Sequence, residues 1–255
     1  MQDTDGMNLS NRTVVVTGGA SGIGLALAVR CQRAGSTVIV CGRREDKLRD
    51  AQVAFPGLIT HVADVSTPGG RVALRDWVVR QHPSVDVLVN NAGIQRRVSL
   101  MDDEPWEATH EEIAINLEAP VHLSRLFIPH LHAKPQAAIV NVTSGLSFAP
   151  LANVPVYCAT KAALHSFTLS LRHQLRDTSI DVVEIVPPAV DTDLGGPGLH
   201  TFGVDVDEFA DAVMSRVAAG EREVGYGFAE QSRHASREQL DATFEHMNAP
   251  RSDAR

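Results

Sequence analysis

Residues 157–161 read YCATK, which places a tyrosine and a lysine four positions apart. Side chains at i and i+4 lie on one face of a helix, so Tyr157 and Lys161 would be neighbours if this segment is helical. A tyrosine is a poor base near neutral pH because its pKa is about 10, and a nearby cation favours the phenolate. The spacing predicts a proton-transfer pair or, alternatively, one turn of an amphipathic helix whose lysine reaches to solvent.

A glycine-rich segment, TGGASGIG (17–24), joins a β-branched run to a helical pattern. Gly18, Gly22 and Gly24 allow the backbone to turn tightly and to approach a pyrophosphate, and the N-terminus of the helix offers free N–H groups to an anion. The alternative is a plain turn. The position after the first expected strand favours a dinucleotide site.

Strand-like and helix-like patterns alternate along the chain. The expected strands cover residues 12–18, 36–42, 58–65, 85–91, 137–144 and 180–186, and the helical patterns cover 22–34, 45–54, 69–81, 104–134, 156–176 and 206–219. Strands separated by helices indicate a parallel sheet, and continuous Val and Ile runs indicate that helices cover both faces. We predict one domain over residues 1–255, an α/β doubly wound parallel sheet of the Rossmann type with three layers, α/β/α.

Two segments after the sixth expected strand have a different character. Residues 193–205, DLGGPGLHTFGVD, contain four glycines and a proline and are predicted to form a mobile loop next to the substrate. From about residue 230 the tail is polar, and we expect a peripheral helix or partial disorder there.

Composition excludes several classes of protein. The net charge of −8 argues against an extended nucleic-acid surface, and no apolar run reaches the ~18 residues of a membrane-spanning helix. The first residues, MQDTDGMNLSNR, do not resemble a signal peptide, so we expect a cytoplasmic protein. Cys31, Cys41 and Cys158 form no C-x-x-C pair and are predicted to be reduced core thiols. The histidines lack the i, i+4 spacing of a helical zinc pair, so we expect no metal site. No Gly-x-Ser-x-Gly elbow is present, which argues against a serine hydrolase.

Further short motifs follow in order: DV (64–65), NNAG (90–93) and TS (143–144), each at the end of an expected strand. With the Gly-x-x-x-Gly-x-Gly spacing and the Tyr157–Lys161 pair, the series resembles the short-chain dehydrogenase/reductase family over residues 12–192. The cofactor contacts that the resemblance implies are Gly18, Ser21, Gly22, Ile23, Gly24, Asp64, Val65, Asn91, Ala92, Gly93, Tyr157, Lys161, Pro187, Val190 and Thr192.

In the family, Asp64 would bind the adenine amine, and Thr192 with the Val190 backbone would hold the nicotinamide carboxamide. A capping Asp64 and a loop threonine are the alternatives. Pro188 stands where the family often has glycine, which predicts a different entry to the substrate loop.

The residues after the second expected strand bear on the choice of dinucleotide. NAD-binding units usually place an acid there, whereas this chain has Gly42 followed by Arg43 and Arg44. An arginine can donate to a 2′-phosphate, so NADP(H) is favoured over NAD(H). The alternative is that both arginines are solvated and that Glu45 or Asp46 meets the ribose.

The resemblance also supplies a catalytic set of Asn116, Ser144, Tyr157 and Lys161. Ser144 would hydrogen-bond a substrate carbonyl, Tyr157 would donate or accept the proton, and Asn116 would anchor a water on the proton path from Lys161. A capping Ser144 and a helix-bending Asn116 are the alternatives. The set predicts an oxidoreductase that interconverts a carbonyl and a secondary alcohol, with a small-molecule substrate.

Two other functions fit the sequence less well. A non-catalytic dinucleotide sensor on the same sheet would not need the four polar residues together, and a sugar-nucleotide epimerase would need a larger C-terminal domain. The predicted walls of the substrate pocket are Ile94, Gln95, Leu146, Phe148, Leu151, Val154 and residues 193–205, and their apolar character suggests a moderately hydrophobic ketone or aldehyde. Members of the family commonly form dimers or tetramers through helices equivalent to 104–134 and 156–176, so a homodimer or homotetramer is expected.

Overall fold

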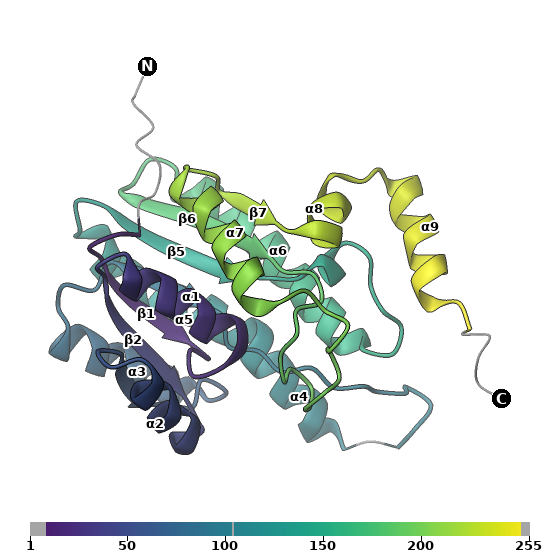
Figure 1. Cartoon of the computed structure of the whole chain (residues 1–255), viewed down its shortest axis with the longest axis horizontal. Coiled ribbons are helices and arrows are strands. Elements are labelled where there is room, and N and C mark those ends of the chain that lie inside the picture. The colour runs from purple at the N-terminus through teal and green to yellow at the C-terminus, as the bar shows by residue number, and fades with distance from the viewer. Residues whose placement is uncertain (1–8, 104, 251–255) are drawn as a thin grey trace.

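The computed structural model describes residues 9–103 and 105–250, and parallel strands form the centre of the molecule (Figure 1). Residues 1–8 and 251–255 of the predicted domain, and Glu104 at the start of a predicted helix, lie outside the described residues. The strand order is β3 (Ile59–Val62), β2 (Thr37–Gly42), β1 (Thr13–Thr17), β4 (Val87–Asn90), β5 (Ala137–Val142), β6 (Ile180–Val186) and β7 (Glu223–Gly225), with all neighbours parallel. The order reverses between β1 and β4, and ligands bind beyond the carboxyl ends of strands at such a point.

Helices cover both faces of the sheet because successive strand side chains point to opposite faces. Val14 and Val16 of β1 pack with α1 (Gly22–Arg33), α2 (Glu45–Ala54) and α7 (Val206–Ala218). Val15 packs instead with α3 (Pro68–Gln81), α5 (Ala119–His132) and α6 (Pro155–Gln174). The predicted three-layer doubly wound fold is confirmed, and β7 is a strand that the sequence patterns did not reveal.

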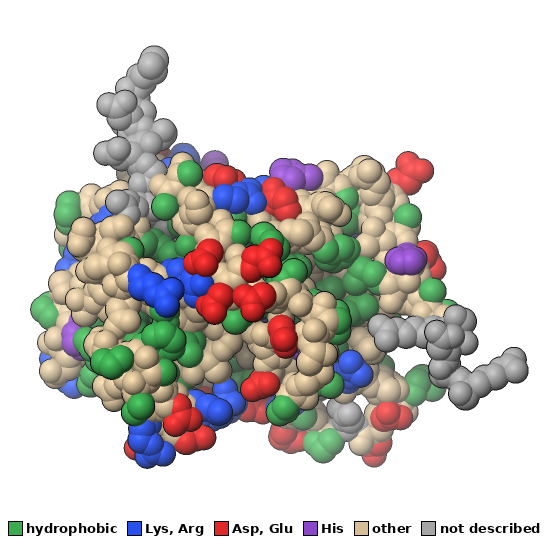
Figure 2. All heavy atoms as spheres, in the orientation of Figure 1, with side chains coloured by type: hydrophobic (Ala, Val, Ile, Leu, Met, Phe, Trp, Pro, Cys, Tyr) green, Lys and Arg blue, Asp and Glu red, His purple; other side chains and the backbone are tan. Residues whose placement is uncertain are grey.

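Acidic side chains gather over α7 on the face shown in Figure 2. Arg30 of α1 reaches two of them, with contacts of 2.5 Å to Asp207 and 2.8 Å to Asp211. Asp205 caps α7 by accepting from the backbone N–H groups of Asp207 and Glu208, both at 2.9 Å. The helix that follows the 193–205 loop is therefore fixed at its start and along its side.

The helix predicted over 104–134 is not continuous. The chain forms α4 (Trp106–Ile113), a π-helical turn (Ala114–Glu118) and then α5. Pro120 has no N–H, so the α-helical bond from residue 120 back to the carbonyl of Asn116 cannot form. The N–H of Ala119 instead bonds five residues back, to Ala114. The proline thus accounts for a distortion that the hydrophobic periodicity alone did not indicate.

The polar tail forms α8 (Gly227–His234) and α9 (Arg237–Asn248), and α9 lies at the edge of the molecule (Figure 1). Ser236 and Gln239 make a capping box at its start. At its end the Asn248 side chain accepts from Ala152 N at 2.7 Å and donates to Pro150 O at 3.1 Å. Within the described ranges, no helix is both long and apolar enough to span a bilayer.

Close packing at the start of α1 requires glycine. A Cβ on Gly24 would lie 2.3 Å from Asn91 Nδ2 and 2.4 Å from Gly18 O. The same Asn91 Nδ2 donates to Thr17 O at 3.0 Å, so it ties the turn after β4 to the end of β1. A side chain at position 24 would push these segments apart.

Gly24→Ala is expected to lower the free energy of unfolding by about 1–3 kcal/mol, as overpacking does. Urea denaturation measures the change. Gly69→Ala is the matched control, because Gly69 lies in α3 and a Cβ there meets no atom within 4 Å. That variant should be neutral or up to about 1 kcal/mol more stable. Equal destabilisation of both variants would contradict the packing argument.

Candidate active site

A cleft of ≈ 2270 Å³ runs along the carboxyl ends of the strands. Most of the predicted site residues line it: Gly18, Ser21, Gly22, Ile23, Gly24, Arg43, Arg44, Val65, Asn91, Ala92, Gly93, Ser144, Tyr157, Lys161, Pro187, Val190 and Thr192. Asp64 and Asn116 are not among its lining residues. The fold therefore gathers segments that lie as far apart in the chain as the glycine turn and the loop after β6.

The glycine turn has the geometry of a phosphate cradle. Gly18 and Gly22 have φ values of +64° and +53°, which residues with a side chain rarely adopt. A Cβ on Gly18 would lie 2.8 Å from the Cα of Ala92, and one on Gly22 would lie 3.3 Å from Thr192 Cγ2. The turn thus passes close to both the loop after β4 and the loop after β6, directly at the N-terminus of α1. These features fit a dinucleotide pyrophosphate.

A cluster of charges lies beside the glycine turn. Arg43 Nη1 donates to Glu111 at 2.6 Å, Arg96 pairs with the other oxygen of the same carboxylate, and Arg44 Nη2 donates to Ser21 Oγ at 3.1 Å. The two guanidinium groups on Glu111 hold its pKa below the usual range. Two guanidinium groups thus share one carboxylate, and a third lies against the glycine turn.

The acids that the sequence offered as alternatives occupy other positions. Glu45 and Asp46 lie in the first turn of α2, where they suit the helix dipole. Asp64 accepts from the backbone N–H of Ser66 at 2.9 Å, as a turn-capping aspartate does. Its contact with adenine stays a prediction.

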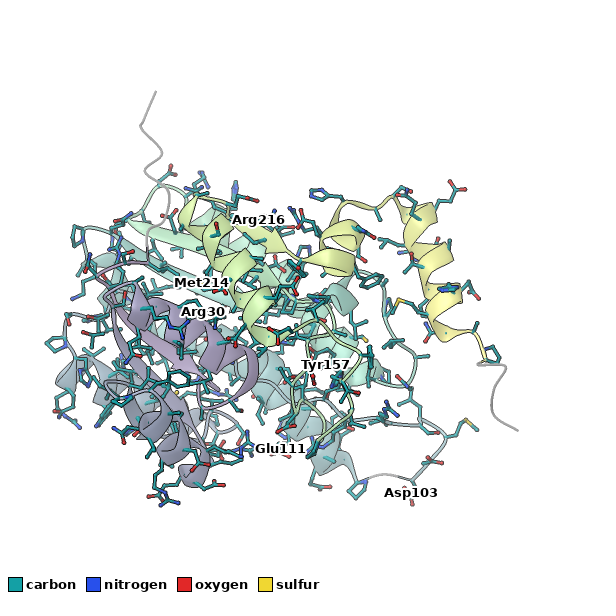
Figure 3. All side chains as sticks on the ribbon, viewed as in Figure 1. Arg30, Asp103, Glu111, Tyr157, Met214 and Arg216 are labelled. Atoms are coloured by element: carbon teal, nitrogen blue, oxygen red, sulfur yellow. The ribbon has the colours of Figure 1, made fainter. Side chains whose placement is uncertain are left out.

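Tyr157 and Lys161 lie one turn apart at the start of α6, and Figure 3 labels the tyrosine. Lys161 Nζ is 5.7 Å from the centre of the Tyr157 ring and donates to the carbonyl of Val142, the last residue of β5, at 2.8 Å. The side chain of Ser144, which follows β5, lies near enough to Tyr157 to lower its pKa. The structure brings together three of the four predicted catalytic side chains at the cleft.

Burial controls the acidity of this group. Tyr157 and Lys161 are only 6% and 4% exposed. Burial raises the pKa of Tyr157 above its usual range, and the nearby Ser144 side chain opposes this rise. Burial lowers the pKa of Lys161 to about 8, and the negative charge of Glu184 opposes that fall. The charge of Lys161 therefore responds to small changes in its surroundings near neutral pH.

The π-helical turn places Asn116 against the loop after β4. Its Oδ1 accepts from Ile94 N at 2.9 Å, and its Nδ2 donates to Ile94 O at 2.8 Å and to Thr160 Oγ1 at 3.3 Å. A Cβ on Gly93 would lie 3.4 Å from Asn116 Oδ1 and 3.7 Å from Lys161 Nζ. Asn116 thus holds the predicted cofactor loop beside Lys161, and its role as a water anchor stays a prediction.

The substrate end of the cleft has one wall that the sequence did not suggest. Ile94, Gln95, Leu146, Leu151, Val154 and much of the 193–205 loop line it as predicted, together with Pro188. Phe148 does not, and packs instead edge-on against His165 with ring centres 4.8 Å apart. The additional wall is α9, which contributes Thr243, His246 and Met247. The capping box was the local signal for this helix, but its position depends on the Asn248 contacts.

The cysteines pack as core residues. All three are buried and unpaired. Burial raises the pKa of the Cys31 and Cys41 thiols to about 12. Cys158 packs with Val154 and Tyr157, and burial raises its pKa as well.

Two buried glutamates near the site were not anticipated, Glu112 of α4 and Glu184 of β6, and both are fully buried. Neither oxygen of Glu112 makes a hydrogen bond of normal geometry within residues 9–103 and 105–250. Burial raises its pKa to about 7, and the backbone N–H of Arg96 opposes the rise. Its negative charge acts on Tyr157 and Cys158, whose pKa values it raises.

Comparison with known proteins agrees with this geometry. The family described as short chain dehydrogenase matches residues 12–199. The protein named Uncharacterized oxidoreductase DltE of Bacillus subtilis (strain 168) is 47% identical over 248 residues, which cover 95% of this chain and 98% of the relative. The chain belongs to the short-chain dehydrogenase/reductase family and is an oxidoreductase of that family.

Solved structures share the fold. A short chain dehydrogenase from Burkholderia cenocepacia J2315 in complex with NADP has a TM-score of 0.80 and 25% identity, covering 93% of this chain and 99% of that chain. A short chain dehydrogenase/reductase from Burkholderia phymatum in complex with NAD has a TM-score of 0.76 and 21% identity, covering 85% and 89%. These two proteins were thus solved with different pyridine nucleotides.

Glu112 should make stability depend on pH. Its pKa is about 7 in the folded protein and 4.5 in its ordinary state, so the folded state binds the proton more tightly. The resulting stabilisation is complete below the lower value and is lost as the pH rises through 7. Glu112→Gln is therefore expected to be more stable than the parent by up to about 3 kcal/mol at alkaline pH, and by less in mild acid.

Urea denaturation from mildly acidic to alkaline pH measures this difference. The matched control is Glu107→Gln, an exposed change on the same helix, which should leave the pH dependence as it is. A Glu112→Gln variant whose stability follows the parent at every pH would show that this carboxyl does not titrate as described.

Proposed function

We propose that the protein is an NADP(H)-dependent oxidoreductase that interconverts a carbonyl and a secondary alcohol. The observation that carries the proposal is the convergence of Ser144, Tyr157 and Lys161 on the cleft that also contains the glycine turn. A dinucleotide on that turn and a carbonyl at Ser144 would be neighbours, since one cleft holds both positions.

The residues that would hold the dinucleotide fall into three groups. The glycine turn and the N-terminus of α1 would bind the pyrophosphate, the loop at Asn91–Gly93 would lie along the nucleotide, and Val190 with Thr192 would meet the nicotinamide end. When bound, the dinucleotide supplies or accepts the hydride. Lys161 has three donors and gives one to Val142, which leaves two for the cofactor and for proton exchange.

Proton transfer is the task of the side chains. In reduction, the hydroxyls of Ser144 and Tyr157 donate to the substrate carbonyl oxygen, and the Tyr157 proton passes to that oxygen as negative charge develops on it. The Lys161 cation stabilises the phenolate that remains, as does the N-terminus of α6, because Tyr157 lies in its first turn. In oxidation, the phenolate takes the proton back.

The preference for NADP(H) rests on the positive excess of Arg43, Arg44 and Arg96 over Glu111 beside the glycine turn. A 2′-phosphate can replace part of the Glu111 contact with Arg43 and make charge-assisted hydrogen bonds. The proteins from Burkholderia cenocepacia and Burkholderia phymatum were solved with NADP and with NAD respectively, so the proposed preference depends on these charges alone. A 2′-hydroxyl is uncharged and can make only weaker hydrogen bonds with these guanidinium groups.

The apolar walls at Ile94, Leu146, Leu151 and Val154 favour a small, moderately hydrophobic carbonyl or alcohol as substrate. The proposal includes a single cytoplasmic domain that assembles as a homodimer or homotetramer, with no nucleic-acid or membrane partner. Sedimentation of the purified protein tests the assembly.

Tyr157→Phe is expected to lower turnover by at least about a thousandfold, because the proton donor is lost while the ring is kept. NADPH binding, measured by fluorescence titration, should change by less than about threefold. A panel of ketones and aldehydes with NADPH and NADH supplies the assay. Unchanged turnover in the variant would refute the role of Tyr157, and parent protein that binds NADPH but turns over none of the panel would favour a dinucleotide sensor.

Arg43→Ala is expected to reduce the ratio of kcat/KM for NADPH to that for NADH by about tenfold to a hundredfold, since one charge-assisted contact is worth about 1.5–3 kcal/mol. Glu111→Gln should raise the same ratio, because it frees Arg43 for the phosphate. Arg49→Ala, an exposed change in α2 away from the cleft, is the control. A ratio that stays constant in Arg43→Ala would remove the basis for NADP(H) preference.

A further inference from the structure

A buried carboxylate, that of Glu184, lies against His165, which is one turn beyond Lys161 on α6. Glu184 occupies an otherwise apolar stretch of β6, and its side chain is 0% exposed. Its Oε1 accepts from Thr143 Oγ1 at 2.6 Å, and Oε2 lies 2.9 Å from Nδ1 of His165. A charge in such a place costs free energy unless it is paired and hydrogen-bonded. The hydrogen bonds account for how Glu184 is tolerated but not for why a carboxylate is there.

Two elements, α6 and β5, bring this carboxylate and Lys161 to the same region. Tyr157, Lys161 and His165 follow one another at i, i+4 and i+8 and so share one face of α6. Lys161 donates to the carbonyl of Val142, and the next residue of the chain, Thr143, donates to Glu184. In the β5–β6 pairing, Val142 stands opposite Ile185, the neighbour of Glu184. The ammonium and the carboxylate thus approach the same end of β5.

Charged groups from α4, α6, β6 and β7 act on Tyr157, Lys161 and His165. Glu112 of α4 acts on Tyr157, and Glu184 of β6 acts on both Lys161 and His165. The hydrogen bond with Glu184 raises the pKa of His165, a rise that burial opposes. Glu223 of β7 raises it further, and Arg172 of α6 lowers it. The Glu184 carboxylate therefore favours the protonated form of His165.

We propose that Glu184, held by Thr143 and His165, is a positioning residue that keeps Lys161 protonated and so sets the pH range in which Tyr157 exchanges its proton. The inference rests on the proposed function, because it takes Tyr157 as the proton donor. Glu184 touches neither substrate nor cofactor in this scheme. It acts through the charge of Lys161, whose desolvation would otherwise favour the neutral amine.

The sign of the effect follows from treating Tyr157 and Lys161 as one coupled pair. A nearby negative charge raises the pKa at which the pair loses its first proton, whichever group releases it. Glu184→Gln removes that charge, so the first apparent pKa falls. The charge of Glu184 acts on Lys161 and is not among the causes that shift the pKa of Tyr157. Without that charge, the proton that remains on the pair therefore rests more often on the tyrosine. The productive form, a phenolate beside a cation, becomes rarer.

The experiment measures kcat/KM against pH in both directions, with the substrate found in the panel and with the folded, full-length protein. For Glu184→Gln, the alkaline limit of reduction should move to lower pH by about one unit, and the plateau rate of oxidation should fall about tenfold. His165→Gln keeps a hydrogen-bond donor but removes the positive charge, so its alkaline limit should move to higher pH. Glu184→Asp keeps the carboxylate and should stay within about half a unit of the parent.

Glu221→Gln, an exposed change before β7, is the control for loss of one negative charge at a distance. If the role of Glu184 is purely structural, Glu184→Gln will lower the rates or the stability while the alkaline limit of reduction stays at the pH of the parent. That result would overturn the inference. If Glu184→Gln does not fold, His165→Gln decides alone: a shift to higher pH supports the inference, and no shift or a shift to lower pH refutes it. The proposed function has its own test, since loss of turnover in Tyr157→Phe with an unshifted profile in His165→Gln would reject only the role of Glu184.

Discussion

The buried ammonium of Lys161 is the interaction on which the site depends. Lys161 is 4% exposed, and its burial lowers its pKa to about 8, so its charge must be supported by the groups that surround it. The carbonyl of Val142 accepts one hydrogen bond, and the Glu184 carboxylate supplies opposite charge. A tyrosine at the same depth needs that cation if it is to release a proton near neutral pH. The charge state of the proposed catalytic pair therefore depends on β5 and β6 as much as on α6.

The reversal of strand order between β1 and β4 supplies the space beside that pair. At this point the glycine turn after β1 and the Asn91–Gly93 loop after β4 lie against each other, and both line the cleft. Glycines at the contact points let the backbones approach within a distance that a Cβ would forbid. The dinucleotide end and the proton-transfer end of the cleft thus share one rigid frame.

A distorted helix connects the two ends. Pro120 prevents a regular bond to the carbonyl of Asn116, and the π-helical turn that results aims the Asn116 side chain at Ile94 and Thr160. These contacts span the loop after β4 and the helix that bears Lys161. A local irregularity in one helix therefore fixes the spacing between the cofactor loop and the catalytic helix.

The sequence by itself determined the sheet, its three layers and most residues of the cleft. Val and Ile runs, glycine positions and the Tyr157–Lys161 spacing are local signals, and a parallel sheet brings the ends of its strands to one edge. Only the tertiary structure decided the partners of Arg43, the π-helical turn and the α9 wall of the cleft. It also decided where the buried carboxylates of Glu112 and Glu184 lie near the Tyr157–Lys161 pair. Glu111 meets Arg43 from 68 positions away, and Glu184 meets His165 from the next strand. Such contacts depend on how separate elements pack, and no period or spacing within one element encodes them.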